Sequence, residues 1–154
     1  MLGYWNNDEE TKKVLKDGWL YTGDIGEFEN NFLKITDRKK DIIITPGGDN
    51  ISPVKIENYL LKLNFIEQAL VYGDNKPYLV SLIVLSNDYK ELNEEIILKE
   101  IEKINKNLSK IEKIKKFFLI KDQFSIENGM LTPTLKLKRY KIIQKYKKEF
   151  EKLY

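Results

Sequence analysis

The sequence predicts an α+β fold in which a small mixed sheet is covered by packed helices. Three apolar runs of strand length occur at 69–73, 78–85 and 114–120. Three other segments, at 56–63, 94–110 and 139–153, carry apolar residues at helical spacing. Strands and helices follow one another without strict alternation, which favours the α+β class over a parallel α/β sheet.

The first forty residues are rich in predicted strands. A short helical pattern covers 8–15, and the turn Asp17-Gly18 leads to a strand at 19–22. Two further strands, 25–29 and 32–36, are joined by a turn at Asn30-Asn31, since asparagine is common in turns.

The segment 35–53 has the most distinctive order of residues in the chain. Alternating apolar residues lead into a charged group at 37–41, a run of β-branched residues follows, and Pro46-Gly47-Gly48 makes a turn. This order predicts a strand, a pivot, a second strand, a tight loop and a helix. Ser52 followed by Pro53 predicts where that helix begins, because serine caps helices and proline favours the first turn.

Each of the three predicted long helices has a single apolar face. The residues expected to point inward are Ile56, Tyr59, Leu60 and Leu63 in the first helix, Ile97, Ile101, Ile104 and Leu108 in the second, and Ile142, Ile143, Tyr146, Phe150 and Leu153 in the third. The pattern of the second helix lasts less than three heptads, so packing on the sheet is favoured over a coiled coil.

The composition restricts the chemistry that this chain can perform. Its 154 residues include no cysteine and no histidine, and 33% of them are charged. A thiolate, a disulfide and the commonest general base are therefore excluded. Catalysis or binding must depend on lysine, arginine, carboxylates and backbone groups.

The net charge of +3 is unevenly distributed. The last 22 residues contain eight basic and two acidic residues, which leaves the preceding 132 with a net charge of −3. Such a tail could meet phosphates, and its simpler interpretation is a solvated helix face.

Three motifs in a fixed order resemble a known family. They are Gly-Trp-Leu-Tyr-Thr-Gly-Asp at 18–24, the segment 35–53, and Leu-Thr-Pro-Thr-Leu-Lys-Leu-Lys-Arg at 131–139. Together they resemble the C-terminal part of the adenylate-forming acyl-CoA synthetases, in particular the long-chain fatty acid CoA ligase branch. The resemblance extends from about Gly3 to Arg139.

The resemblance implies that Thr22, Asp24 and Arg38 bind the nucleotide. Asp24 would accept hydrogen bonds from the ribose hydroxyls of ATP and of the acyl-adenylate, and the Arg38 guanidinium would donate to ribose or phosphate oxygens. The simpler alternatives are a turn-capping Asp24 and a surface ion pair of Arg38 with Asp37 or Asp41.

The resemblance also implies which residues take part in the rotation of the C-terminal domain between the two half-reactions. Lys40 corresponds to the family's hinge, and Gly47 and Gly48 correspond to the loop that lines the path of the CoA pantetheine. The alternatives are an ordinary solvated lysine and a plain turn.

Lys136 is the catalytic residue that the resemblance implies. It would neutralise the carboxylate and the α-phosphate as negative charge gathers during adenylate formation. Many family members have Ser-Gly-Lys where this chain has Thr134-Leu135-Lys136. That departure leaves Lys138 as a rival for the role.

The expected domain division is 1–37 as the tail of the large N-terminal adenylation domain and 38–154 as the C-terminal lid domain. The chain contains no glycine-rich loop ending in lysine that could hold a triphosphate, so it is expected to be inactive alone. ATP and Mg²⁺ are expected to bind mainly to the N-terminal domain of the same enzyme, with a fatty acid and CoA as the other substrates and AMP as a product. No metal site and no nucleic-acid partner are expected in this chain.

Two other functions stay open at this stage. One is a stand-alone basic α+β module that binds nucleic acid or an anionic surface, and the other is an adenylate-forming ligase for a different carboxylic acid. The longest apolar run, at 78–85, is too short to span a membrane. A cytoplasmic location is expected, with peripheral membrane contact of the whole enzyme left open.

Overall fold

The computed structural model describes residues 1–154 and divides into two compact units, Met1–Lys40 and Asp41–Tyr154. The predicted division at 37/38 into parts of two domains stays a prediction, because a division into compact units does not show from which domain each part comes.

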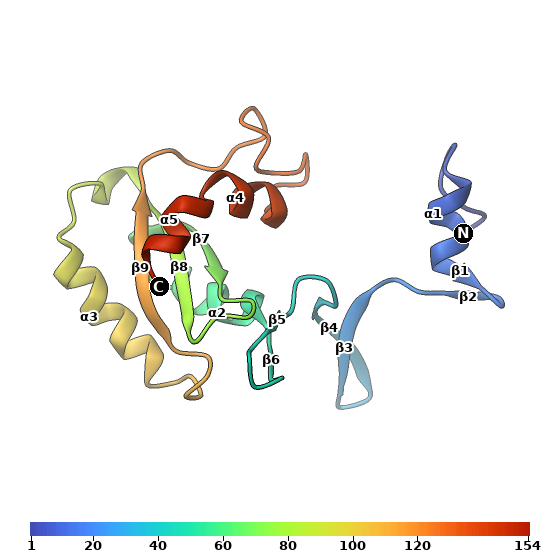
Figure 1. Ribbon diagram of the computed structural model, residues 1–154, viewed down its shortest axis with the longest axis horizontal. Coiled ribbons are helices and arrows are strands. Elements are labelled where there is room, and N and C mark those ends of the chain that lie inside the picture. Colours follow the sequence, from blue (N-terminus) through green and yellow to red (C-terminus); the bar gives the residue numbers. More distant parts are fainter. The chain divides into compact units, whose positions relative to one another are not determined.

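The first unit contains one short helix and two hairpins (Figure 1). Helix α1 spans Asp8–Val14, and β1 (Leu15–Lys16) pairs antiparallel with β2 (Trp19–Leu20). Strand β3 (Asp24–Glu29) pairs antiparallel with β4 (Phe32–Arg38). Asn30 and Asn31 both have positive φ angles, the conformation of a tight hairpin turn.

The second unit contains a mixed sheet of order β7-β8-β9. Strand β7 (Ile66–Tyr72) runs antiparallel to β8 (Leu79–Leu85), and β8 runs parallel to β9 (Ile114–Ile120). The connection from β8 to β9 contains the 3-10 helix η1 (Asn87–Tyr89) and helix α3 (Glu94–Asn105). The predicted α+β class with a small mixed sheet is confirmed.

Helices cover both faces of this sheet, and β8 is buried along its whole length. On one face, Leu79 and Ile83 of β8 pack with residues of α2 (Pro53–Leu60) and α3. On the other face, Val80 and Leu82 pack with residues of α4 (Arg139–Lys145) and α5 (Lys147–Lys152). Figure 1 shows α4 and α5, in red, lying across the strands. A central strand with two buried faces explains the continuous apolar run at 78–85.

Helix α2 begins where the sequence predicts. Ser52 is its N-cap, with its Oγ accepting a hydrogen bond from the Lys55 backbone N–H at 3.2 Å, and Pro53 opens the first turn. The short strands β5 (Ile43–Ile44) and β6 (Asn50–Ile51) precede it and pair antiparallel across the glycine turn.

Two helix predictions were wrong in extent. Helix α3 ends at Asn105, five residues before the predicted end, where the Lys106 and Asn107 N–H groups donate to carbonyls three residues back. The Asn105 side chain then binds the Ile114 backbone, accepting from its N–H and donating to its C=O. The predicted helix 139–153 is two helices, α4 and α5, interrupted at Tyr146 with φ −100° and ψ 23°. Tyr146 and Phe150 still point into the core, as predicted.

Candidate functional site

The three predicted nucleotide-binding residues meet at one end of the β3–β4 hairpin. Asp24 and Arg38 are cross-strand partners, and the Arg38 Nε lies 3.1 Å from the Asp24 Oδ1. The Thr22 Oγ1 accepts a hydrogen bond from the Asp24 N–H at 3.1 Å. The chain brings these residues together because hairpin register places its first and last residues opposite each other.

Arg38 has a carboxylate partner, Asp24, that the alternative drawn from the sequence did not name. The guanidinium forms a salt bridge with Asp24, whereas Asp37 accepts a hydrogen bond from the Arg38 backbone N–H at 2.7 Å. The Arg38 side chain is 54% exposed and that of Asp24 is 25% exposed. This geometry leaves carboxylate and guanidinium groups open to hydroxyl and phosphate oxygens at one place.

Lys40 is exposed in the turn that follows β4, and the boundary between the two compact units falls directly after it. A solvated lysine there would stay solvated when the backbone rotates. The hinge role itself stays a prediction.

The Gly47-Gly48 loop is closed by Thr45 and Asp49. The Thr45 Oγ1 donates to the Asp49 Oδ2 at 3.0 Å and accepts from the Asp49 N–H at 3.1 Å. Gly48 has φ 87°, the left-handed region that glycine adopts without strain. The loop is exposed, so its backbone is open to a ligand.

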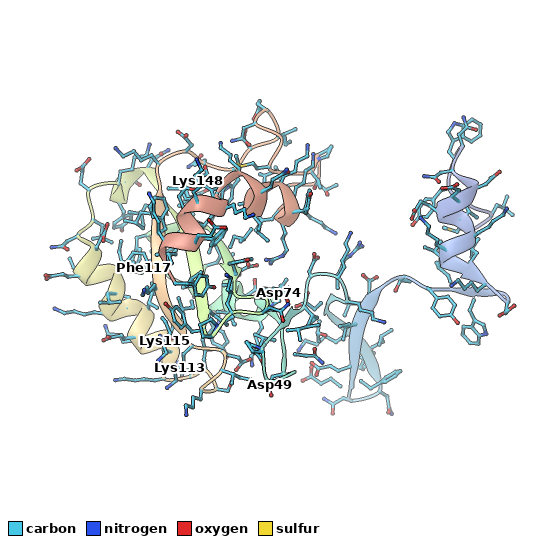
Figure 2. All side chains as sticks on the ribbon, viewed as in Figure 1. Asp49, Asp74, Lys113, Lys115, Phe117 and Lys148 are labelled. Atoms are coloured by element: carbon cyan, nitrogen blue, oxygen red, sulfur yellow. The ribbon has the colours of Figure 1, made fainter.

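The Gly47-Gly48 loop is also tied to the turn between β7 and β8. The Asp74 Oδ1 accepts from the Ile44 N–H at 3.1 Å, and the Ile44 carbonyl accepts from the Asn75 N–H at 2.9 Å. Figure 2 labels both carboxylates: Asp49 lies in the glycine loop itself, and Asp74 lies in the neighbouring turn between β7 and β8.

Lys136 lies in a tight hairpin that its own backbone closes. Its N–H donates to the Thr132 Oγ1 at 3.0 Å, and its carbonyl accepts from the Thr132 N–H at 2.8 Å. Leu135, at the tip, has φ 60°. The Lys136 side chain is exposed and joins no salt bridge, so its ammonium is available to an anion.

Lys138, the rival, is placed differently. It is half-buried, and its N–H donates to the Met130 carbonyl at 2.8 Å at the base of the same hairpin. The geometry therefore favours Lys136, which lies nearer the tip, as the side chain that projects outward.

Sequence reasoning missed one buried ion pair. The Arg139 guanidinium donates to the Glu57 Oε2, and the Glu57 Oε1 accepts from the Val71 N–H at 2.7 Å. These partners lie 82 residues apart in the chain, and no local pattern predicts their contact. The only local signal was a glutamate next to the apolar positions of α2.

Comparison with known proteins agrees with the motifs. The family model for the AMP-binding enzyme C-terminal domain matches residues 40–154. The chain is 35% identical over 99% of its length to a long-chain fatty acid CoA ligase, FadD15, of Mycobacterium tuberculosis, and 37% identical over 99% to long-chain fatty acid CoA ligase 5 of Mus musculus. It spans only 29% and 26% of those two proteins.

Solved structures give the same result. The adenylation domain of a carboxylate reductase from Mycobacterium chelonae superposes with a TM-score of 0.89 at 26% identity, covering 99% of this chain and 26% of that chain. The corresponding domain from Segniliparus rugosus, solved with AMP and a co-purified carboxylic acid, superposes with a TM-score of 0.88 at 26% identity over the same shares.

The fold, the order of the three motifs and the extent of these similarities lead to one assignment. This chain belongs to the family of AMP-binding enzyme C-terminal domains.

Proposed function

We propose that this chain is the C-terminal part of an ATP-dependent, AMP-forming long-chain fatty acid CoA ligase. The observation that carries the proposal is the similarity to such ligases along the whole chain, through all three motifs. In this proposal 1–37 is the tail of the N-terminal adenylation domain and 38–154 is the mobile lid. The activity belongs to the longer polypeptide.

The first half-reaction forms the acyl-adenylate. A fatty acid carboxylate attacks the α-phosphate of ATP, a P–O bond forms, and pyrophosphate leaves with its electron pair. Asp24 and Arg38 hold the ribose, and the Lys136 ammonium neutralises the charge that gathers on the carboxylate and α-phosphate oxygens. Lys136 moves no proton in this step, because its role is electrostatic.

The second half-reaction forms the thioester. Rotation about Lys40 withdraws Lys136 and brings Gly47 and Gly48 to the path of CoA. The CoA thiol, losing its proton, attacks the acyl carbonyl of the mixed anhydride, and AMP leaves. Two orientations of one lid thus allow one cleft to serve both reactions.

ATP, AMP, the fatty acid and CoA are the proposed ligands, with the N-terminal domain as the main partner. No group of three or more acidic side chains in this chain gathers as a metal site would require, so no step through Mg²⁺ is assigned to these residues. None of the helices has the length and apolar content of a membrane-spanning segment. A cytoplasmic location is proposed, and cell fractionation tests it against peripheral membrane contact of the whole enzyme.

Two observations bear on the alternative functions. Of the four aromatic residues in the basic tail, Tyr146 and Phe150 are buried, Tyr154 packs partly buried against the same core, and Tyr140 is exposed. One exposed ring offers no row of stacking positions for successive bases, which disfavours the nucleic-acid module. The identity of the acid depends on a binding pocket outside this chain, and the long-chain acid is proposed from the relatives alone.

The testing experiment compares the two half-reactions in the full-length enzyme carrying Lys136→Ala. The rate of ATP–pyrophosphate exchange with a long-chain acid should fall about 100-fold or more, because the variant loses a positive charge that stabilises the transition state. Thioester formation from supplied acyl-adenylate should be unchanged. Lys138→Ala is the matched control and should retain adenylation. Equal loss in both half-reactions, or greater loss in the control, would remove Lys136 from this role.

A further inference from the structure

The hairpin that carries Lys136 is attached to the domain at both of its ends. On the incoming side, Met130 and Leu131 are buried in the core beneath α4 and α5. On the outgoing side, Arg139 begins α4, three residues after Lys136. Backbone hydrogen bonds also tie the incoming side to the Ser125 carbonyl, from the Met130 N–H at 3.1 Å and the Leu131 N–H at 3.0 Å. On the outgoing side the charged hydrogen bond of Arg139 has a defined geometry, so it contributes to the orientation of the hairpin.

Arg139 reaches the carboxylate of Glu57, a residue of α2. The Glu57 side chain is 7% exposed and that of Arg139 is 13% exposed. One Glu57 oxygen accepts from Arg139, and the other accepts from the Val71 N–H of β7 at 2.7 Å. Glu57 therefore links the start of α4 to both α2 and the sheet.

We propose that Glu57 and Arg139 are positioning residues for adenylation, which hold the Lys136 hairpin at the angle that presents its ammonium to the reacting phosphate. This inference rests on the proposed function. A buried ion pair often adds little net stability compared with apolar residues of the same volume, so its presence at the base of this hairpin calls for another role.

The Gly47-Gly48 loop is held by different contacts. Thr45, Asp49 and Asp74 fix it, and none of those hydrogen bonds includes Glu57 or Arg139. Loss of the ion pair should consequently disturb the half-reaction that uses Lys136 and spare the half-reaction that uses the loop.

Glu57→Gln in the full-length enzyme is the first test. The glutamine oxygen can still accept from the Val71 N–H, while its amide nitrogen, another donor, faces Arg139. We expect kcat for ATP–pyrophosphate exchange to fall about 10- to 100-fold, the effect of a small misplacement of a catalytic group. The KM for ATP and the rate of thioester formation from supplied acyl-adenylate should be unchanged.

Arg139→Lys is the second variant, because it keeps a positive charge beside Glu57 and so protects the fold. It loses the planar guanidinium, so we expect an adenylation rate between those of wild type and Glu57→Gln, with thioester formation unchanged. The matched control is Glu112→Gln. Glu112 pairs with Lys55 of the same helix, α2, at 2.6 Å and has no contact with the hairpin, so both half-reactions should be retained.

Three results would overturn the inference. They are adenylation at the wild-type rate in folded Glu57→Gln and Arg139→Lys enzymes, equal loss in both half-reactions, and a selective adenylation defect in the Glu112→Gln control. Measuring Lys136→Ala in parallel distinguishes failure of the proposed Lys136 role from failure of the inference about Glu57 and Arg139. If adenylation survives Lys136→Ala, the proposed role of Lys136 fails and the inference fails with it, whereas adenylation lost in Lys136→Ala but kept in Glu57→Gln overturns the inference alone.

Discussion

Among single residues, Glu112 shows how a partly buried carboxylate is kept charged. Burial by itself would raise its pKa, but hydrogen bonds from Lys55 and from the Ser109 hydroxyl and backbone N–H outweigh burial and lower the pKa below 4.5. The Lys55 Nζ lies 2.6 Å from Oε1, and the Ser109 Oγ lies 2.7 Å from Oε2. These contacts join α2 to the turn that precedes β9.

The direction of this pKa shift predicts a dependence of stability on pH. A carboxylate whose folded-state pKa lies below its unfolded value adds stability above that unfolded value, and the contribution is lost as pH falls through the folded pKa. Glu112→Gln should lower the free energy of unfolding at about pH 7 by at most about 1 kcal/mol, and the difference should shrink as pH falls below the unfolded pKa and through the lower folded pKa.

Urea unfolding of the 154-residue chain at neutral and at acid pH measures this difference. Glu102→Gln, at an exposed position of α3 outside any salt bridge, is the control and should have no such effect. A constant difference between Glu112→Gln and wild type at both pH values would contradict the proposed linkage.

At the scale of elements, two short loops are held by separate sets of contacts. The glycine loop between β5 and β6 depends on Asp74 of the β7–β8 turn, whereas the Lys136 hairpin depends on Arg139. Removing the Asp74 side chain takes this acceptor from the Ile44 N–H, so we expect the glycine loop to loosen while the Lys136 hairpin keeps its contacts.

Asp74→Ala in the full-length enzyme should therefore slow thioester formation from supplied acyl-adenylate about tenfold and leave ATP–pyrophosphate exchange unchanged. This is the reverse of the pattern expected for Glu57→Gln. Asp88→Ala, at an exposed position of η1, serves as the control. A defect confined to pyrophosphate exchange would show that the glycine loop belongs to the other half-reaction.

On the scale of the whole molecule, the chain consists of two compact units with the boundary after Lys40. Proline fixes φ near −65°, so a proline at this position restricts backbone rotation. Lys40→Ala removes the same side chain and leaves the backbone free, which makes it the matched control.

Lys40→Pro in the full-length enzyme should retain adenylation and lose thioester formation by about tenfold or more, because only the second half-reaction requires the rotated lid. Lys40→Ala should support both. Pre-steady-state measurement of the two half-reactions separates these outcomes. Thioester formation at the same rate in both variants would place the hinge elsewhere.

The sequence alone determined the features that depend on neighbouring residues. The bounds of β9, the cap at Ser52, the hairpin turn at Asn30-Asn31 and the inward faces of the helices all follow from local spacing, because periodicity records which side of an element is buried. The motifs also identified Asp24, Arg38 and Lys136 as candidate site residues.

Only the tertiary structure decided which of those elements and charges meet. The parallel pairing of β8 with β9 and the contact of Glu57 with Arg139 join residues that are distant in sequence. Within the β3–β4 hairpin, the register shift between Ile25 and Gly26 sets Arg38 opposite Asp24. Helix α3 also ends at Asn105, and the last helix is interrupted at Tyr146, although apolar residues continue at helical spacing past both points. The local spacing of apolar residues determines which side of each segment can be buried. The strand partner and the strand register depend on the complete core and on the need to pair every buried charge.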